Sequence, residues 1–206
     1  MKVILVNGSP HEKGCTYTAL CEVEKALKNN GIETEIFWIG NKPITGCIAC
    51  GACAKLGRCF ADDTVNTFVE KAQTADGFIF GSPVYYASAS GSITSFMDRA
   101  FYSGGRFLTN KPAASVASCR RGGASATFDQ LNKYFTINNM PVVSSQYWNQ
   151  VHGNTPEQVL QDEEGLQTMR TLGNNMAWLL GCIEAGKAAG IEPPEREPFI
   201  RTNFIR

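Results

Sequence analysis

The chain has 206 residues, and its 19 basic and 19 acidic residues give a formal net charge of zero. This length suits one domain with a sizeable core, and the balanced charge excludes electrostatic attraction to nucleic acid or to an anionic membrane surface. No apolar stretch reaches the roughly 18 residues of a membrane span, and the opening MKVILVNGSP is too short an apolar run for a signal peptide. We therefore expect a cytoplasmic protein whose eight cysteines are ligands or redox groups rather than disulfides.

Short apolar runs alternate with amphipathic segments in the first half of the chain. Residues 3–6 have no polar face, which predicts a central parallel strand buried on both sides. A helix follows and ends at an Asn-Gly pair, and a second strand is predicted over residues 32–39. Residues 40–62, rich in Gly and Cys, are expected to form a long functional loop, after which Asp63 caps a helix over residues 64–74.

The second half continues this alternation. Strands are expected over residues 77–80, 113–118 and 141–147. Apolar residues at i, i+3, i+4, i+7 and i+8 from Ile93 predict an amphipathic helix. Another helix follows the fourth strand, and a long helical region starts near Pro156.

Five strands alternating with helices predict an α/β, doubly wound parallel sheet. The flavodoxin-like strand order 2-1-3-4-5 fits five strands better than a six-stranded dinucleotide fold does. We therefore predict a single flavodoxin-like domain over residues 1–206, with the cysteine-rich loop 40–62 and a surface tail over residues 190–206.

The segment GSPHEKGCTYT after the first strand is suited to a phosphate. Backbone N–H groups at the start of the following helix, with the hydroxyls of Ser9 and Thr16, can surround a dianion, and Gly14 allows a close approach. His11 can add a donor. The segment is neither a Walker A loop nor G-x-G-x-x-G, and its few fixed cations suit the terminal phosphate of FMN. The alternative is an ordinary strand-to-helix turn, with His11 solvated.

The segment GSPVYYASASG after the third strand is predicted to receive a flat ring. Pro83 stiffens the turn, and small residues from Ala87 to Gly91 let a flavin approach the backbone, whose N–H groups can reach N5 and O4. Tyr85 and Tyr86 are candidates to flank the ring. Alternatively, both tyrosines cap the sheet or lie at an interface.

A third loop, CRRGG, follows the fourth strand at the same edge of the sheet. Arg120 or the N–H of Gly122 can compensate charge on the N1–C2=O2 side of a flavin, which stabilises the anionic reduced form. The alternative is a surface loop with solvated arginines.

Cys47, Cys50, Cys53 and Cys59 form the pattern C-x2-C-x2-C-x5-C. Four thiolates indicate an iron–sulfur cluster or zinc. The unbroken C-x2-C-x2-C run is typical of bacterial ferredoxins and favours a 4Fe–4S cluster, although five residues precede the fourth cysteine and no Pro follows it. Zinc and free thiols remain as alternatives. Elsewhere, Cys21 and Cys182 are expected on buried helix faces.

Together these segments resemble the NADPH-dependent FMN reductase superfamily and, within it, the iron–sulfur flavoproteins of anaerobes. The resemblance covers nearly the whole chain and rests on GSPHEKGCT, the cysteine run followed by Asp62-Asp63, GSPVYYASASGSITSFMDR and SSQYWNQVHG. It implies that the first loop binds the FMN phosphate and the second binds the ring. The residues so implied are Ser9, His11, Gly14, Cys15 and Thr16 for the phosphate, and Pro83, Val84, Tyr85, Tyr86 and Ser88 for the ring.

The resemblance also implies a homodimer or homotetramer. One functional hypothesis is an FMN-dependent oxidoreductase that takes electrons from NAD(P)H or a low-potential donor and reduces small acceptors, with the 4Fe–4S cluster in the path. The cofactor carries such chemistry, so no side chain need act as an acid or a base. The alternative is an iron–sulfur flavoprotein that carries electrons between ferredoxin-like partners. A zinc- or thiol-based redox-sensing module without flavin is a third possibility.

Overall fold

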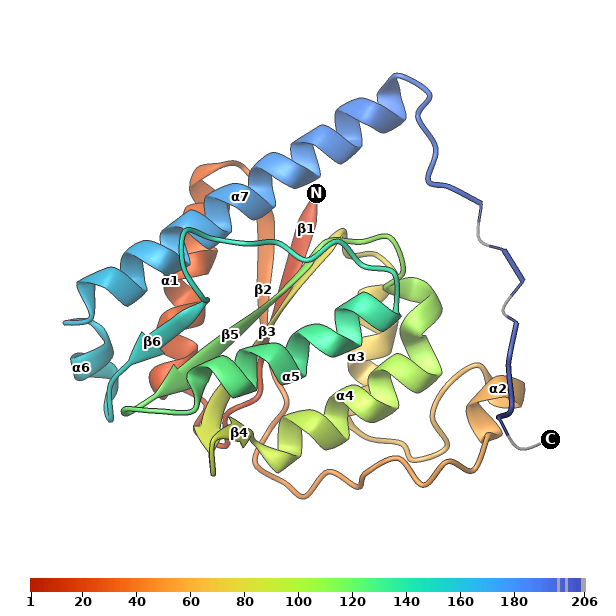
Figure 1. The fold of residues 1–206 in the computed structure, drawn as a ribbon, viewed down its shortest axis with the longest axis horizontal. Coiled ribbons are helices and arrows are strands. Elements are labelled where there is room, and N and C mark those ends of the chain that lie inside the picture. Colours follow the sequence, from red (N-terminus) through yellow and green to blue (C-terminus); the bar gives the residue numbers. More distant parts are fainter. Residues whose placement is uncertain (196, 199, 205–206) are drawn as a thin grey trace.

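A computed structural model describes residues 1–195, 197–198 and 200–204. Within them, five strands form a parallel sheet in the order β2-β1-β3-β5-β6 (Figure 1). These strands are β1 (Lys2–Asn7), β2 (Glu33–Trp38), β3 (Gly77–Tyr85), β5 (Ala113–Cys119) and β6 (Gln150–His152). The short strand β4 (Ser88–Ala89) pairs antiparallel with the end of β3. The predicted flavodoxin-like sheet is therefore confirmed, with β4 as an addition.

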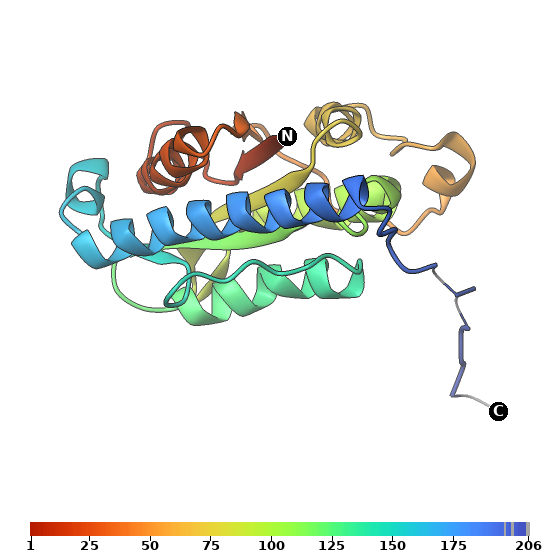
Figure 2. The same cartoon turned by 90° about the horizontal axis from the view of Figure 1, so that it is seen from above.

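Helices cover both faces of the sheet. The helices α1 (Cys15–Asn29) and α7 (Glu163–Ala188) pack against one face. The other face is covered by α3 (Thr64–Ala72), α4 (Gly91–Gly104) and α5 (Ala124–Ile137). The long helix α7 extends along the molecule from the end that holds α6 toward the end at which α2 lies (Figure 2). No helix in the described part of the chain combines the length and apolar character of a membrane crossing.

The core is divided between the two faces because side chains alternate along each strand. On β1, Ile4 and Val6 face α3, α4 and α5, whereas Val3 and Leu5 face α1 and α7. Phe68 lies at the centre of the first cluster, fully buried. Its ring centroid is 5.2 to 5.9 Å from those of four other aromatic rings, namely Phe37, Phe78, Phe80 and Phe96.

The predicted strand over residues 141–147 is wrong. That segment meets the sheet only through an isolated bridge between Ala113 and Val142, and the fifth parallel strand is β6. The Ser145 hydroxyl explains the difference, because it donates to the Tyr147 carbonyl at 2.7 Å and accepts from the Tyr147 N–H at 3.3 Å. This local turn competes with strand pairing.

Two further segments contain more secondary-structure elements than predicted. The cysteine-rich loop contains the short helix α2 (Ala52–Leu56), which lies between Gly51 and Gly57, both at positive φ. The long helical region near Pro156 consists of α6 (Pro156–Val159) and α7, each with its own capping side chain. Cys182 is exposed, so its predicted burial on α7 is wrong, and Cys21 on α1 is only half-buried.

Other local predictions are confirmed. Asp63 caps α3 by accepting a hydrogen bond from the Val65 N–H at 3.0 Å. The predicted amphipathic helix from Ile93 is α4, and Ser90 caps it. The described residues after Gly190 are exposed, as expected of a surface tail.

Candidate functional site

The loop after β1 is braced by polar contacts to its backbone. The buried Asn7 side chain donates to the Glu12 carbonyl at 2.9 Å and accepts from the Ser9 N–H at 3.1 Å. From the end of β2, Trp38 Nε1 donates to the Ser9 carbonyl at 2.8 Å. The Ser9 hydroxyl accepts from the His11 N–H at 3.1 Å. These contacts set the path of the chain into α1.

Helix α1 begins at this loop with unpaired N–H groups. Its N-terminal residue is preceded by Gly14, and no side chain in the described structure caps it. The first hydrogen bond of the helix runs from the Thr18 N–H to the Gly14 carbonyl at 3.0 Å. The N–H groups of Cys15, Thr16 and Tyr17 therefore have no partner within the helix. Such an end attracts an anion.

The side chains predicted to bind a phosphate are not equally available. The Thr16 hydroxyl is buried and lies 2.7 Å from the Ser118 hydroxyl on β5. The Cys15 thiol donates to the Gly153 carbonyl at 3.7 Å, and burial raises its pKa. The His11 side chain is exposed. Backbone N–H groups, rather than these side chains, are thus the main donors at this loop.

The loop after β3 is tied to the first loop and to α5. The Ser90 hydroxyl donates to the Gly8 carbonyl at 3.1 Å, and the Ser82 hydroxyl accepts from the Ser90 N–H at 3.0 Å. The Ser88 hydroxyl donates to Gln130 Oε1 at 2.6 Å. Ser88 therefore braces the loop in the structure, and a direct contact of its hydroxyl with a flavin stays a prediction.

The tyrosines of this loop face solvent. Tyr85 is 46% exposed, and Tyr86 is fully exposed at a φ of 51°. Pro83 and Val84 are half-buried at the end of β3. Because the Tyr86 side chain is fully exposed, a planar ligand can reach its ring.

The loop after β5 touches the ring loop. Gly123 precedes α5 at a φ of 91°, and a Cβ atom there would lie 2.6 Å from Ala87 Cα. Arg120 and Gly122 are exposed. Burial raises the pKa of the neighbouring Cys119 thiol. The carboxyl ends of β1, β3 and β5 thus bring the three predicted loops to one edge of the sheet, as a doubly wound fold requires of a ligand site.

The four cysteines of the C-x2-C-x2-C-x5-C run line one pocket, here called the four-cysteine pocket. It has an empty volume of about 440 Å³, which includes space open to solvent. Cys59 is buried and Cys53 half-buried, whereas Cys47 and Cys50 are exposed. Among the described residues, no three His, Cys, Asp or Glu side chains converge closely enough to hold one metal ion. The thiols are therefore gathered but do not close around a single point.

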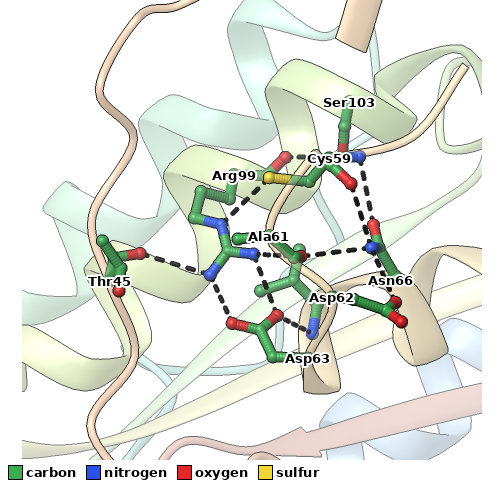
Figure 3. Close-up of polar contacts among 9 residues, drawn as sticks. Thr45, Cys59, Ala61, Asp62, Asp63, Asn66, Arg99 and Ser103 are labelled. Carbon is green, nitrogen blue, oxygen red and sulfur yellow. Dashed lines mark hydrogen bonds and ion pairs between the residues drawn. The ribbon is translucent and has the colours of Figure 1, made fainter. Parts of the chain in front are cut away.

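Three hydrogen bonds with the side chains of Asn66 and Arg99 hold Cys59 in place (Figure 3). The Asn66 side chain accepts from the Cys59 N–H and donates to the Cys59 carbonyl, both at 3.1 Å. Arg99 Nε donates to Cys59 Sγ at 3.2 Å. Burial by itself would lower the pKa of Arg99, but its hydrogen bonds and charge interactions with Asp63 and Cys59 together raise that pKa. The guanidinium is therefore a permanent positive charge beside this sulfur.

Sequence reasoning missed Arg99 and Asn66. A signal for Arg99 was available, because it lies three residues after Phe96 on the buried stripe of α4. A charged residue on a buried apolar stripe requires a partner of opposite charge, and the partner is the half-buried Asp63, the residue predicted only to cap α3.

Helix α4 connects the two sites. Its cap, Ser90, belongs to the ring loop, whereas Arg99 and Tyr102 line the four-cysteine pocket. At 1.5 Å per residue, Arg99 lies roughly 14 Å along the axis from Ser90. Figure 1 shows the segment after β2 passing along α4 to α2.

Solved structures of other proteins share this architecture. The chain is similar to a flavodoxin from the domain Archaea, with a TM-score of 0.61 over 88% of this chain and 99% of the other, at 13% identity. With loops at the carboxyl ends of β1, β3 and β5, it is a flavodoxin-like α/β protein. Residues 1–155 match the family described as NADPH-dependent FMN reductase. The chain belongs to that family of flavoprotein oxidoreductases, which confirms the resemblance seen in the sequence.

Curated relatives extend the similarity beyond residue 155. An iron-sulfur flavoprotein of Methanocaldococcus jannaschii is 35% identical over 192 residues, covering 89% of this chain and 100% of the relative. An iron-sulfur flavoprotein of Methanosarcina thermophila is 29% identical over 193 residues, covering 91% and 99%. The chain thus matches iron-sulfur flavoproteins over nearly their full length.

Proposed function

We propose that the protein is an FMN-dependent oxidoreductase that takes electrons from NAD(P)H or a low-potential donor and reduces small acceptors, with a 4Fe–4S cluster in the four-cysteine pocket. The single observation that carries this proposal is the gathering of Cys47, Cys50, Cys53 and Cys59 in one pocket along α4, the helix that starts at the ring loop. When bound, FMN supplies two-electron and one-electron chemistry at its ring, and the cluster supplies one-electron chemistry.

The residues at the sheet edge fit FMN. The unpaired N–H groups at the start of α1 would hold the phosphate, with Ser9 setting the loop conformation. Pro83, Val84, Tyr85 and Tyr86 would lie against the ring, and Arg120 or the N–H of Gly122 would face its N1–C2=O2 side. Because the cofactor carries the chemistry, no side chain has to act as an acid or a base. The protein would orient the ring and leave one of its faces open to reactants.

The four thiols that line the four-cysteine pocket match in number the ligand set of a 4Fe–4S cluster. A tetrahedral zinc site would need the same four sulfurs within about 2.3 Å of one point. A 4Fe–4S cluster takes its thiolates at separate irons, so its ligands stand further apart. The positive φ angles of Gly51 and Gly57 turn the chain around α2 and bring Cys50, Cys53 and Cys59 to the same pocket.

One observation favours the alternative of an electron carrier between ferredoxin-like partners. Cys47 and Cys50 are exposed, and so are the neighbouring apolar side chains of Ile48, Phe60 and Tyr102. A redox centre at such a surface can exchange electrons with another protein.

We also propose that the protein is cytoplasmic and that it forms a homodimer or homotetramer. Exposed aromatic side chains support the oligomer, namely Tyr147, Trp148 and Trp178.

Anaerobically purified protein tests the proposal. We expect one FMN, about four irons and about four inorganic sulfides per chain, as the composition of a 4Fe–4S cluster requires. Bleaching of the flavin by NADPH under argon supports the oxidoreductase. Bleaching only by a reduced ferredoxin, with no subsequent reduction of a small acceptor such as a quinone, supports the carrier. Protein that stays colourless when FMN is supplied contradicts both.

Gly123→Ala is expected to weaken FMN binding at least about tenfold, because the new Cβ would displace Ala87 in the ring loop. A small displacement of groups that contact a ligand is enough to lower its affinity by this amount. Fluorescence titration of flavin-free protein with FMN measures the dissociation constant. Gly31→Ala is the matched control, because Gly31 also has a positive φ but a Cβ there meets nothing within 4 Å. Equal affinities in the two variants would contradict the placement of the ring loop at the flavin.

A further inference from the structure

Arg99 is buried on α4 with every donor used. Its side chain is 2% exposed. Nη1 and Nη2 donate to the two Asp63 carboxylate oxygens at 2.6 and 2.9 Å. Nη1 also donates to the Thr45 carbonyl at 3.3 Å, and Nη2 donates to the Ala61 carbonyl at 2.9 Å. With Nε directed at Cys59 Sγ, the five N–H groups of the guanidinium have five partners (Figure 3).

These partners bracket the cysteine run. Thr45 lies just before Cys47, and Ala61 just after Cys59. Arg99 therefore ties both ends of the segment to one point on α4 and, at the same point, donates to one of its sulfurs. A residue that only closed the loop would need the carbonyl contacts and not the sulfur contact.

Cys59 differs from the other three cysteines in this respect. It is 8% exposed, and its backbone is held by Asn66 while its sulfur is held by Arg99. By contrast, the Cys53 sulfur contacts the Tyr102 carbonyl at 3.9 Å, and Cys47 and Cys50 are exposed. Of the four cysteine sulfurs in the pocket, the Cys59 sulfur is therefore held in position by a positively charged side chain.

We propose that Arg99 is a positioning residue that orients the Cys59 sulfur and raises the reduction potential of the cluster in the four-cysteine pocket. The inference rests on the proposed function. Hydrogen bonds to ligand sulfurs and the net charge nearby set the potential of an iron–sulfur cluster. Because Arg99 supplies both a donor and a positive charge, it stabilises the added electron. Removing it also leaves the Asp63 carboxylate unpaired, which acts in the same direction.

Three variants separate charge, geometry and loop closure. Arg99→Gln removes the charge, and Arg99→Lys keeps the charge but loses the five-donor fork. Arg106→Gln is the matched control, because Arg106 also ties the segment to the end of α4, through the Gly57 carbonyl at 2.9 Å, but its hydrogen bonds go to carbonyls and not to a cysteine sulfur. Flavin content reports folding in each variant, since the flavin loops lie at the other end of α4.

The measurement is an anaerobic redox titration of the holoprotein, followed by electron paramagnetic resonance, with iron and flavin counted in each sample. In Arg99→Gln we expect the cluster potential to fall by about 59 mV, a tenfold change in the equilibrium constant for one electron. The potential of Arg99→Lys should fall by less, and that of Arg106→Gln should stay close to the parent value, because Arg106 is exposed and solvent screens its charge. If Arg99→Gln loses both iron and flavin, the Arg99→Lys potential decides.

Several results would overturn the inference. Iron-loaded Arg99 variants with the parent potential would show that Arg99 only closes the loop. So would an equal shift in Arg106→Gln, or loss of flavin together with iron in both Arg99 variants. A parent protein that binds flavin but neither iron nor sulfide would overturn the cluster itself, and this outcome is visible before any variant is made.

Discussion

Cys59→Ser is expected to abolish iron binding while flavin binding remains. Serine cannot supply a thiolate, and Cys59 is the buried ligand that Asn66 and Arg99 already hold in place. We expect less than about a tenth of the parent iron content, because three exposed or half-buried thiols must otherwise recruit a fourth ligand from solvent. Iron, sulfide and FMN are counted per chain after anaerobic reconstitution.

Cys182→Ser is the matched control for this change. Cys182 is exposed on α7 and does not line the four-cysteine pocket. It should retain the parent content of both iron and flavin. If Cys59→Ser keeps its iron, or if Cys182→Ser loses it, the assignment of the ligands is wrong. A parallel loss of flavin in Cys59→Ser would instead indicate a general failure of folding.

Phe68→Ala is expected to lower the free energy of unfolding by about 3–5 kcal/mol, the usual cost of deleting a fully buried aromatic ring. Phe68 contacts four other rings, so its removal leaves a cavity that rigid neighbours cannot fill. Because domains of this kind are stable by only about 5–15 kcal/mol, the loss is a large fraction of the total. Urea unfolding of flavin-free protein measures it, since a bound ligand would add its own stabilisation.

Phe204→Ala makes the same chemical change at a residue that is 94% exposed. Its free energy of unfolding should stay within about 0.5 kcal/mol of the parent. A Phe68→Ala loss below about 1 kcal/mol would mean that the aromatic cluster can repack around the vacated volume.

The positions of the buried strands could be predicted because their signal is local. Residues 3–6 form a short apolar run and residues 113–118 a short run of small residues around Val116, and the corresponding strands are β1 and β5. The fifth strand could not be placed in this way. The Val142–Val143 pair has the composition of a strand, but the hydroxyl of Ser145 turns the chain before a ladder can form, and three residues of ordinary composition make β6 instead. Competition between a side chain and a ladder is not visible in composition.

For the candidate site, the sequence by itself determined the chemistry available: four thiols at a ligand spacing, a hydroxyl-rich loop before a helix, and small residues around a ring loop. Each of these features consists of groups within a short stretch of chain, so covalent connection alone keeps the groups close together. Only the tertiary structure decided which groups meet across the chain. Arg99 reaches Cys59 over 40 residues, and Thr16 is engaged by Ser118 over 102, because the packing of α4 and α1 against the sheet sets those distances.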